Sequence, residues 1–294
     1  MDDPAGARPL TDAETGADDG GGADVLLAIP VRLDATLVLV RHGESELIVQ
    51  RRFQGRLDSP LSATGRRQAE RVAARLARPH DPPALPIPEG RPLAIVHSPL
   101  ARAADTAAAI GRAIAAGAEG GGVTHVPDVR LVEIGQGEWE GRLAREIQAD
   151  DGERLTAWRS RPTETWAPGG ERLAEVRERV VAGLTDVLAI LAAAGPPGSL
   201  AAPQVGGYDD GPATHPWSIL VGHDGVFKVA LLALFDLPLE RFWMWSSDLC
   251  GISVVEFRAG RPVVRAMNLT EHLAGLLDEA AQEATEERAR SGAL

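Results

Sequence analysis

Three short apolar runs in this chain are each followed at once by residues able to carry out chemistry, and this pattern constrains the fold more than any other. Residues 35–40 read ATLVLV, residues 93–96 read LAIV and residues 218–221 read SILV. Continuous apolar runs of this length are typical of strands that are buried on both faces. The three runs therefore predict parallel strands in the interior of a sheet.

Segments of helical pattern separate these runs and decide the fold class. They cover residues 64–77, with Thr64 as the expected N-cap, 101–116, 171–194 and 225–235. Two further short strands, 252–257 and 262–267, are joined at Ala259-Gly260 and predict a hairpin. Strands that alternate with helices indicate an α/β fold. We expect a three-layer sandwich with a mostly parallel central sheet flanked by helices.

The residues that follow the strands predict where a ligand binds. In a parallel α/β sheet, ligands bind in the crevice outside the carboxyl ends of the strands. The first strand runs into Arg41-His42, the second is followed by Arg102, and the third runs into His223. The glycine after His42 is expected to let the backbone come close to a ligand. These side chains are therefore expected to converge on one site.

Such a set of residue types suits phosphoryl transfer. A neutral imidazole, here His42, can attack phosphorus, and the guanidinium groups of Arg41 and Arg102 match phosphate oxygens. A protonated His223 would stabilise charge on the equatorial oxygens. The leaving oxygen then needs a proton donor, and Glu133 is the candidate if burial or a neighbouring charge keeps its carboxyl group protonated.

The motifs around these residues resemble the histidine phosphatase superfamily, the phosphoglycerate mutase-like proteins. Six motifs occur in the family's order over roughly residues 36–272. They are Arg41-His42-Gly43-Glu44-Ser45, the stretch from Arg52 to Gly65, Ser98-Pro99-Leu100-Ala101-Arg102-Ala103, the stretch from Glu133 to Gly141, Pro168-Gly169-Gly170-Glu171, and Val221-Gly222-His223-Asp224-Gly225.

The resemblance implies a role for each matching residue. His42 would be the phosphorylated nucleophile, and Glu133 the acid for the leaving oxygen and then the base for water. The phosphoryl group would be bound by Arg41, Arg102 and His223, and the substrate would be bordered by Ser45, Gln54, Gly55 and Asp224. The family implies no metal and no other cofactor, and its members suggest a homodimer.

Two positions depart from the family pattern. Many members carry asparagine six residues after the nucleophile, where this chain has Ile48. One polar phosphate contact is therefore absent or supplied from elsewhere. The residue after the second histidine is often glycine and here is Asp224, whose carboxylate is unfavourable beside a phosphate unless it points away.

Charge and composition exclude several classes of partner. The net charge is −12, and no basic run indicates a nucleic-acid surface. No stretch of about 18 apolar residues predicts a membrane span. Cys250 is the single cysteine, so no intrachain disulfide can form. No signal peptide is recognisable, and the cytoplasm is the expected location. The expected partner is a small phosphorylated substrate.

The chain is expected to form one domain with flexible additions. Residues 1–33 are predicted as an acidic disordered tail and residues 34–275 as the histidine phosphatase domain. A flexible insertion is predicted at about 195–216, and residues 276–294 as a charged C-terminal tail.

Three functions stay open on the sequence alone. The leading one is a phosphomonoester hydrolase that acts on a small phosphorylated metabolite through a phosphohistidine. The alternative is a cofactor-dependent phosphoglycerate mutase, which needs extra basic groups for the two acidic ends of its substrate. A non-catalytic phosphate-ligand binding module would lack the nucleophile or the acid, and both are present here.

Overall fold

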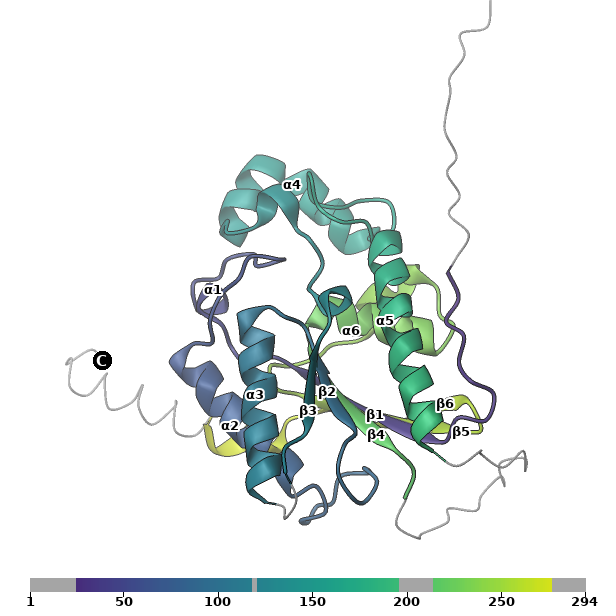
Figure 1. Ribbon diagram of the computed structural model, residues 1–294. Helices are drawn as coiled ribbons and strands as arrows, with labels where there is room; N and C mark the ends of the chain where they lie inside the picture. Colours follow the sequence, from purple (N-terminus) through teal and green to yellow (C-terminus); the bar gives the residue numbers. More distant parts are fainter. Residues whose placement is uncertain (1–24, 118–120, 196–213, 277–294) are drawn as a thin grey trace, which may run out of the picture.

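The computed structural model of the chain describes residues 25–117, 121–195 and 214–276 (Figure 1). Six strands form one sheet in the order β3-β2-β4-β1-β5-β6. The strands are β1 (Ala35–Arg41), β2 (Ala94–His97), β3 (Thr124–Pro127), β4 (Trp217–Gly222), β5 (Ile252–Arg258) and β6 (Arg261–Leu269). The first four run parallel to one another, while β5 pairs antiparallel with β1 and with β6.

Helices cover both faces of this sheet and complete the three layers that the sequence predicted. They are α1 (Glu46–Val49), α2 (Ala63–Ala77), α3 (Ala101–Ala116), α4 (Ala144–Ser160), α5 (Leu173–Ala194) and α6 (Asp224–Leu234). Figure 1 shows α2 and α3 on one side of the sheet and α5 and α6 on the other. Helix α4 lies apart from these layers, at the top of the view.

The central strand β1 shows why a continuous apolar run was needed. Successive side chains of a strand point to opposite faces. Leu37 and Leu39 pack into the cluster formed with α5 and α6, whereas Val38 and Val40 pack into the cluster formed with α2 and α3. All four side chains are buried, so both faces of β1 contribute to the two hydrophobic cores.

The elements that carry strong patterns lie where they were expected, within a few residues. Helix α3 has the predicted bounds, 101–116. The expected N-cap of α2 was wrong: the helix begins at Ala63, and the hydroxyl of Ser62, not Thr64, accepts the hydrogen bond from the Gly65 amide. Two hydroxyl residues separated by Ala63 suit this role equally in sequence, and only the backbone path decides between them.

Two elements had no recognisable signal, namely β3 and α4. Strand β3 reads THVP, is exposed throughout and pairs only with β2, so it lacks the apolar run of a central strand. Helix α4 is rich in charged residues, buries only Ile147, Leu155 and Trp158, and is interrupted by a non-helical backbone at Asp151. Neither pattern favours regular structure on its own.

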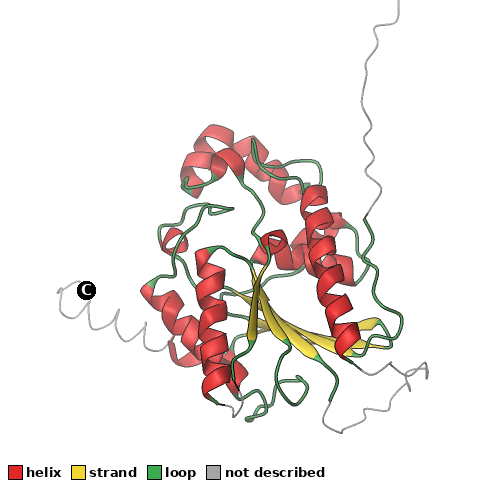
Figure 2. Ribbon diagram, viewed as in Figure 1, coloured by secondary structure: helices red, strands yellow, loops and turns green. Residues whose placement is uncertain are grey.

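The boundaries of the folded part differ in one place from those expected. Residues 25–33 were included in the N-terminal tail, yet Leu33 is buried and Leu27 and Ile29 pack against the core. The predicted insertion at 195–216 and the C-terminal tail at 276–294 lie almost wholly outside the described residues. Figure 2 shows loops at both ends of the sheet, between the strands and the helices. No helix among the described residues is long and apolar enough to cross a membrane.

Candidate active site

The strand register places three chain segments side by side at the carboxyl end of the sheet. Arg41 pairs with Gly222 across β1 and β4, and the amide of His42 donates to the Gly222 carbonyl at 3.0 Å. On the other side of β4, the amide of Ser98 donates to the Val221 carbonyl at 3.0 Å. The parallel pairing therefore brings the residues that follow β1, β2 and β4 to one level, as the sequence predicted.

His42 is held as a nucleophile with a defined tautomer. Its Nδ1 lies 2.7 Å from the Gly43 carbonyl oxygen. A carbonyl only accepts, so Nδ1 carries the proton and the lone pair is on Nε2. Burial lowers the pKa of His42 well below 6.5, and the charges of Arg102 and Arg41 lower it further. The imidazole is therefore neutral near pH 7 and able to attack phosphorus through Nε2.

Gly43 was expected to let the backbone come close to a ligand, but the structure requires a glycine here for another reason. A Cβ at this position would lie 2.5 Å from the carbonyl oxygen of Gly65, which belongs to the first turn of α2. The missing side chain lets the loop after β1 pack directly against the helix. The amide of Gly43 also donates to the hydroxyl of Thr106 on α3 at 3.1 Å, so the nucleophile loop is attached to both helices.

The two arginines are positioned through backbone carbonyls. Arg102, fully buried on α3, donates from Nη1 to the Leu57 carbonyl and from Nη2 to the Gly55 carbonyl, both at 2.9 Å. Arg41 donates from Nη1 to the Ser247 carbonyl at 2.5 Å. Because carbonyls leave the positive charges uncompensated, both guanidinium groups keep their attraction for an anion.

The ring of His223 faces that of His42, and a hydrogen bond with Ser98 holds it in place. The ring centroids of the two histidines are 5.0 Å apart. The Ser98 hydroxyl lies 2.8 Å from His223 Nε2 and accepts from the Leu100 amide at 3.3 Å, so it can donate its proton to Nε2. The ring proton then lies on Nδ1.

His223 was expected to be protonated, but its imidazole is neutral when no ligand is bound. Burial lowers its pKa well below 6.5, and the neighbouring His42, Arg102 and Arg41 lower it further. A neutral ring with its proton on Nδ1 still donates one hydrogen bond. The negative charge of a bound phosphoryl group would raise the pKa again.

Unsatisfied donors mark the place of an anion. Among the described residues, Arg41 Nε, Arg102 Nε and His223 Nδ1 are buried and have no hydrogen-bond partner. Leaving a buried donor unpaired costs about 1–3 kcal/mol, so three in one site call for a ligand. All three belong to residues beside His42, and a group with several acceptor oxygens would satisfy them together.

The Glu133 side chain contacts the first turn of α6 and lines the same cavity as His42. Its carboxyl oxygens accept from the amides of Ile134, at 2.9 Å, and of Gly225 and Val226, each at 3.3 Å. A Cβ on Gly225 would lie 2.7 Å from the Glu133 Oε1, so this glycine makes room for the carboxyl group. The segment after residue 131 is thereby joined to the segment after β4.

The pKa of Glu133 is raised above 4.5, mainly by burial and also by the charge of Asp224. The backbone amides of Ile134 and Gly225 and the charge of Arg102 oppose this rise without cancelling it. The result is a carboxyl group that keeps its proton to a higher pH than an ordinary glutamate. That property is what a general acid for the leaving oxygen requires.

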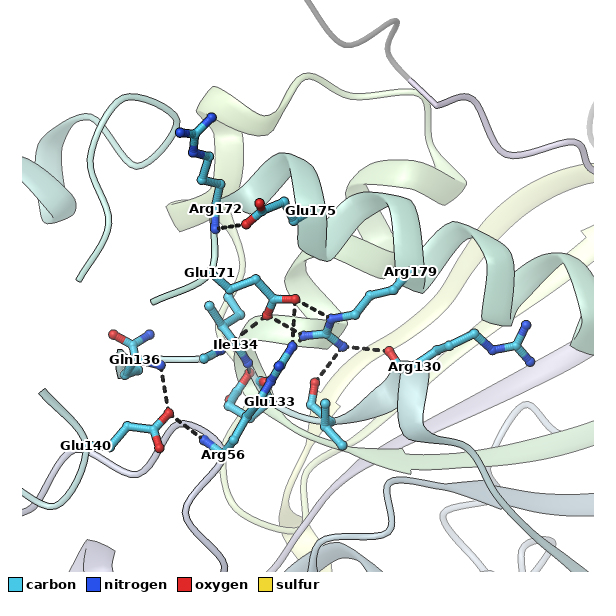
Figure 3. Close-up of polar contacts among 12 residues, drawn as sticks. Arg56, Arg130, Glu133, Ile134, Gln136, Glu140, Glu171, Arg172, Glu175 and Arg179 are labelled. Atoms are coloured by element: carbon cyan, nitrogen blue, oxygen red, sulfur yellow. Dashed lines mark hydrogen bonds and ion pairs between the residues drawn. The ribbon is translucent and has the colours of Figure 1, made fainter. Parts of the chain in front are cut away.

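An ion-pair network holds the backbone on which Glu133 sits (Figure 3). Arg179 on α5 donates from Nε and Nη2 to the two carboxyl oxygens of Glu171 at 2.8 and 2.9 Å. Its Nη1 donates to the carbonyls of Arg130 and Val132 at 2.6 and 2.7 Å, and its Nη2 reaches the Glu133 carbonyl at 3.3 Å. One guanidinium group therefore fixes three carbonyls of the segment that carries the acid.

Glu171 extends this network to the loop that contains Arg56. It accepts from the Gly135 amide at 3.2 Å and from Arg56 Nη2 at 2.7 Å. Figure 3 shows the Glu171 carboxyl group bonded to the guanidinium groups of both Arg179 and Arg56. Sequence reasoning quoted Glu171 within a motif but gave it no role. It missed Arg179, because an arginine in a long amphipathic helix carries no signal of its own.

Replacing Arg179 by methionine is expected to lower kcat/KM by between about tenfold and a hundredfold, because a displaced acid donates its proton poorly. The loss should be greater for an alkyl phosphate than for p-nitrophenyl phosphate, whose leaving group needs little protonation. Arg172→Met is the matched control: Arg172 precedes the same helix and stacks on Trp166, away from the site. Equal losses with both substrates would mean that Arg179 serves only the fold.

The site opens into a cavity of about 320 Å³. Of the predicted substrate contacts, Gln54, Gly55 and Asp224 line it. Ser45 does not: it is fully buried, and its hydroxyl donates to the Gln54 side-chain oxygen at 2.6 Å. Ile48 lies in α1 outside the lining, so the polar contact that asparagine makes in many relatives has no equivalent there.

Aromatic side chains form a wall of the cavity that the sequence motifs did not predict. The wall is made by Phe53, Trp158, Phe242 and Trp243. Trp158 comes from α4, the helix without a sequence signal, and lies 5.7 Å from the Trp243 ring. The wall exists because α4 folds over the carboxyl end of the sheet, which no local pattern predicts.

Comparisons with known proteins agree with this geometry. The sequence model of the histidine phosphatase superfamily (branch 1) matches residues 37–193 and 207–270. Phosphoserine phosphatase 1 of Hydrogenobacter thermophilus is 29% identical over 83% of this chain and 97% of its own length. Glucosyl-3-phosphoglycerate phosphatase of Mycobacterium tuberculosis is 35% identical over 70% of this chain and 78% of its own.

A solved structure and a mutase relative complete the comparison. A mycobacterial glucosyl-3-phosphoglycerate phosphatase in complex with VO3 superposes with a TM-score of 0.62 and 28% identity, covering 80% of this chain and 99% of its own. A Klebsiella pneumoniae protein named "Probable phosphoglycerate mutase GpmB" is 34% identical over a shorter stretch, 54% of this chain and 65% of its own.

Proposed function

Because the chain belongs to the histidine phosphatase superfamily (branch 1), we propose that it hydrolyses a small phosphate monoester through a phosphohistidine at His42. One observation carries the proposal: the neutral His42 ring lies among three buried donors without partners, on Arg41, Arg102 and His223. A phosphoryl group would satisfy these donors and present its phosphorus to Nε2. The phosphatase relatives support the same reaction.

In the first step the lone pair of His42 Nε2 forms a bond to phosphorus, and the bond from phosphorus to the ester oxygen breaks. The leaving oxygen takes the proton of the Glu133 carboxyl group. The guanidinium groups of Arg41 and Arg102 stabilise the charge on the equatorial oxygens. The hydrogen bond from Nδ1 to the Gly43 carbonyl becomes stronger as the ring gains positive charge.

In the second step Glu133, now a carboxylate, takes a proton from water while the water oxygen bonds to phosphorus. The bond from phosphorus to Nε2 breaks, and inorganic phosphate then leaves the site. His42 and Glu133 return to their starting protonation states. The chain's own residues are sufficient for the two steps as written.

Hydrolysis is favoured over the mutase reaction by the charges along the cavity. A phosphoglycerate mutase must bind a second acidic group at the far end of its substrate. Among the described residues that line the cavity, the arginines are Arg41 and Arg102, both at the phosphoryl end. The remaining charged residues of this lining are the acids Glu133 and Asp224.

The test of this function is phosphate release from p-nitrophenyl phosphate and alkyl phosphates in the presence of EDTA, with rapid acid-free quenching to trap the phosphoenzyme. We expect release that survives EDTA and a protein-bound phosphate that is labile in acid and stable in base, as phosphohistidine is. Interconversion of 3- and 2-phosphoglycerate when bisphosphoglycerate is added, without release, would establish the mutase. The absence of both activities would favour a binding module.

Activity is expected to have a bell-shaped pH dependence, because catalysis needs His42 neutral and Glu133 protonated. The acid limb lies below 6.5, since the pKa of His42 is lowered, and the alkaline limb lies above 4.5, since the pKa of Glu133 is raised. Measuring kcat/KM against pH in the wild type and in Glu133→Gln separates the two limbs. The alkaline limb should disappear in the variant, while ionisation of the substrate is the same in both; an unchanged alkaline limb would assign it to another group.

The predicted homodimer, the cytoplasmic location and the roles of the two tails and the insertion stay predictions. The mass in solution tests the first, and a chain shortened by residues 1–24 tests whether the acidic tail affects activity or assembly.

A further inference from the structure

At the end of the cavity next to His42, the positive charges of Arg41 and Arg102 are directed to the phosphoryl group. Arg102 is fixed by the carbonyls of Leu57 and Gly55, and Arg41 by the carbonyl of Ser247. Their Nε atoms have no hydrogen-bond partner, and both residues line the cavity together with His42. Neither side chain can reach outward to a second acidic group without giving up these contacts.

The cavity lining also includes the carboxylate of Asp224, which accepts from the Ser247 amide at 3.2 Å and whose counter-ion is buried. Asp224 lines the cavity, and one of its oxygens lies 2.6 Å from Lys228 Nζ one turn further along α6. The Lys228 side chain is only 6% exposed, whereas that of Asp224 is 27% exposed. The ammonium group lies between this carboxylate and the rings of Trp243 and Phe242, 4.8 and 5.4 Å from their centroids. A ligand in the cavity can therefore contact the Asp224 carboxylate but not the Lys228 ammonium group.

Three aromatic rings line the same cavity as this carboxylate. Trp243 lies 4.7 Å from the Phe242 ring and 5.7 Å from the Trp158 ring, and all three line the cavity. Phe242 and Trp158 are buried, but Trp243 is 45% exposed, which is unusual for a ring of its size. The ammonium group of Lys228 lies over the Trp243 ring and holds it in place from one side. The exposed part of this ring can therefore stack on the ring of a ligand.

Resting on the phosphatase function proposed above, we propose that this cavity selects the phosphate ester of an uncharged, ring-bearing alcohol, such as a sugar, and discriminates against esters that carry a carboxylate. The Trp243 face binds the ring of the leaving alcohol, whose hydroxyl groups hydrogen-bond to Asp224 and to the side chain of Gln54 or Gln136. The Asp224 charge repels a carboxylate at the same place. Asp224 and Trp243 are specificity residues for charge and shape, respectively.

The charge part is tested with two substrates that differ by one group. Glycerol 3-phosphate and 3-phosphoglycerate have the same phosphorylated carbon, and a hydroxymethyl group in the first replaces the carboxylate of the second. We expect kcat/KM to be about tenfold higher for glycerol 3-phosphate, because like charges at short distance repel. In Asp224→Asn this preference should fall to about twofold or reverse, since Lys228 is then left without its acid.

The matched control for charge is Asp236→Asn, at an exposed acid just beyond the far end of α6. It changes the net charge equally but should leave the tenfold preference unaltered. If 3-phosphoglycerate is turned over as fast as glycerol 3-phosphate, or if Asp224→Asn keeps the wild-type ratio, the charge selection is wrong.

The shape part is tested with glucose 6-phosphate against glycerol 3-phosphate, both uncharged outside the phosphate and both esters of a primary alcohol. Trp243→Leu should lower kcat/KM for glucose 6-phosphate about fivefold and leave that for glycerol 3-phosphate within about twofold. Trp166→Leu, which removes a tryptophan outside this cavity, should change neither. Equal losses on both substrates would overturn the role of Trp243.

These outcomes separate the inference from the function on which it rests. Phosphate release from any of the three substrates, with the wrong order of preference, overturns the selectivity and leaves the phosphatase intact. No release from these substrates or from p-nitrophenyl phosphate overturns both.

Discussion

Replacing His42 by alanine is expected to lower kcat for every phosphate monoester by a factor of about 10⁴ or more, because no other side chain can supply the nucleophile. The lone pair of this imidazole lies on Nε2, because Nδ1 carries the proton that bonds to the Gly43 carbonyl. The variant should also form no acid-labile phosphoenzyme. Steady-state release of phosphate and trapping of labelled protein measure both effects.

Phosphate binding distinguishes loss of the nucleophile from loss of the site. Arg41, Arg102 and His223 remain in His42→Ala, so inorganic phosphate should still bind weakly and raise the melting temperature. His80→Ala, an exposed histidine far from the strand ends in sequence, is the control for the loss of one imidazole. Wild-type rates in His42→Ala would contradict the nucleophile assignment, and loss of phosphate binding would indicate that the loop has collapsed.

The second large effect is expected for Glu133→Gln, with a size that depends on the leaving group. An alkyl phosphate needs a proton on its leaving oxygen, and its kcat/KM should fall about 10²–10³-fold. p-Nitrophenyl phosphate leaves as a stabilised anion and should lose less than about tenfold. A difference between these two losses is the signature of a general acid, because a role in folding or binding would lower both alike.

The substitution needs a check of structure, because the carboxyl group accepts hydrogen bonds through both oxygens. The amide nitrogen of glutamine cannot accept from Gly225 or Val226, so the start of α6 loses part of its contact. A melting curve and phosphate binding will show whether the variant is folded. Glu138→Gln, at an exposed acid in the same segment, should retain full activity; a loss there would move the acid role to that residue.

The fold was largely predictable because its central strands carry their own signal. A run such as ATLVLV suits a strand with neighbours on both sides and helices on both faces, and β1 has these surroundings. The hairpin of β5 and β6 was also expected, from its two apolar runs and the Ala259-Gly260 turn. The exposed edge strand β3 and the charged helix α4 were not predicted, since their stability depends on contacts with distant parts of the chain.

The site was predictable to the extent that its residues follow strands directly. Arg41, His42 and His223 lie immediately next to strand ends, so the alternation of strands and helices already placed them at one edge of the sheet. The protonation states were not accessible in this way. The lowered pKa of His223 results from burial beside His42 and two arginines, which only the packed structure brings together.

The sequence by itself determined the fold class, the family motifs and the chemistry of the phosphoryl end, because apolar runs and strand-end residues act locally. The tertiary structure alone decided which groups support that chemistry and which side chains line the rest of the cavity. Arg179 reaches the Glu133 segment across 46 residues of sequence, and Trp158 meets Trp243 across a longer separation. Contacts of this kind depend on how whole helices pack over the sheet, and no local pattern encodes the direction of a single side chain on an exposed helix.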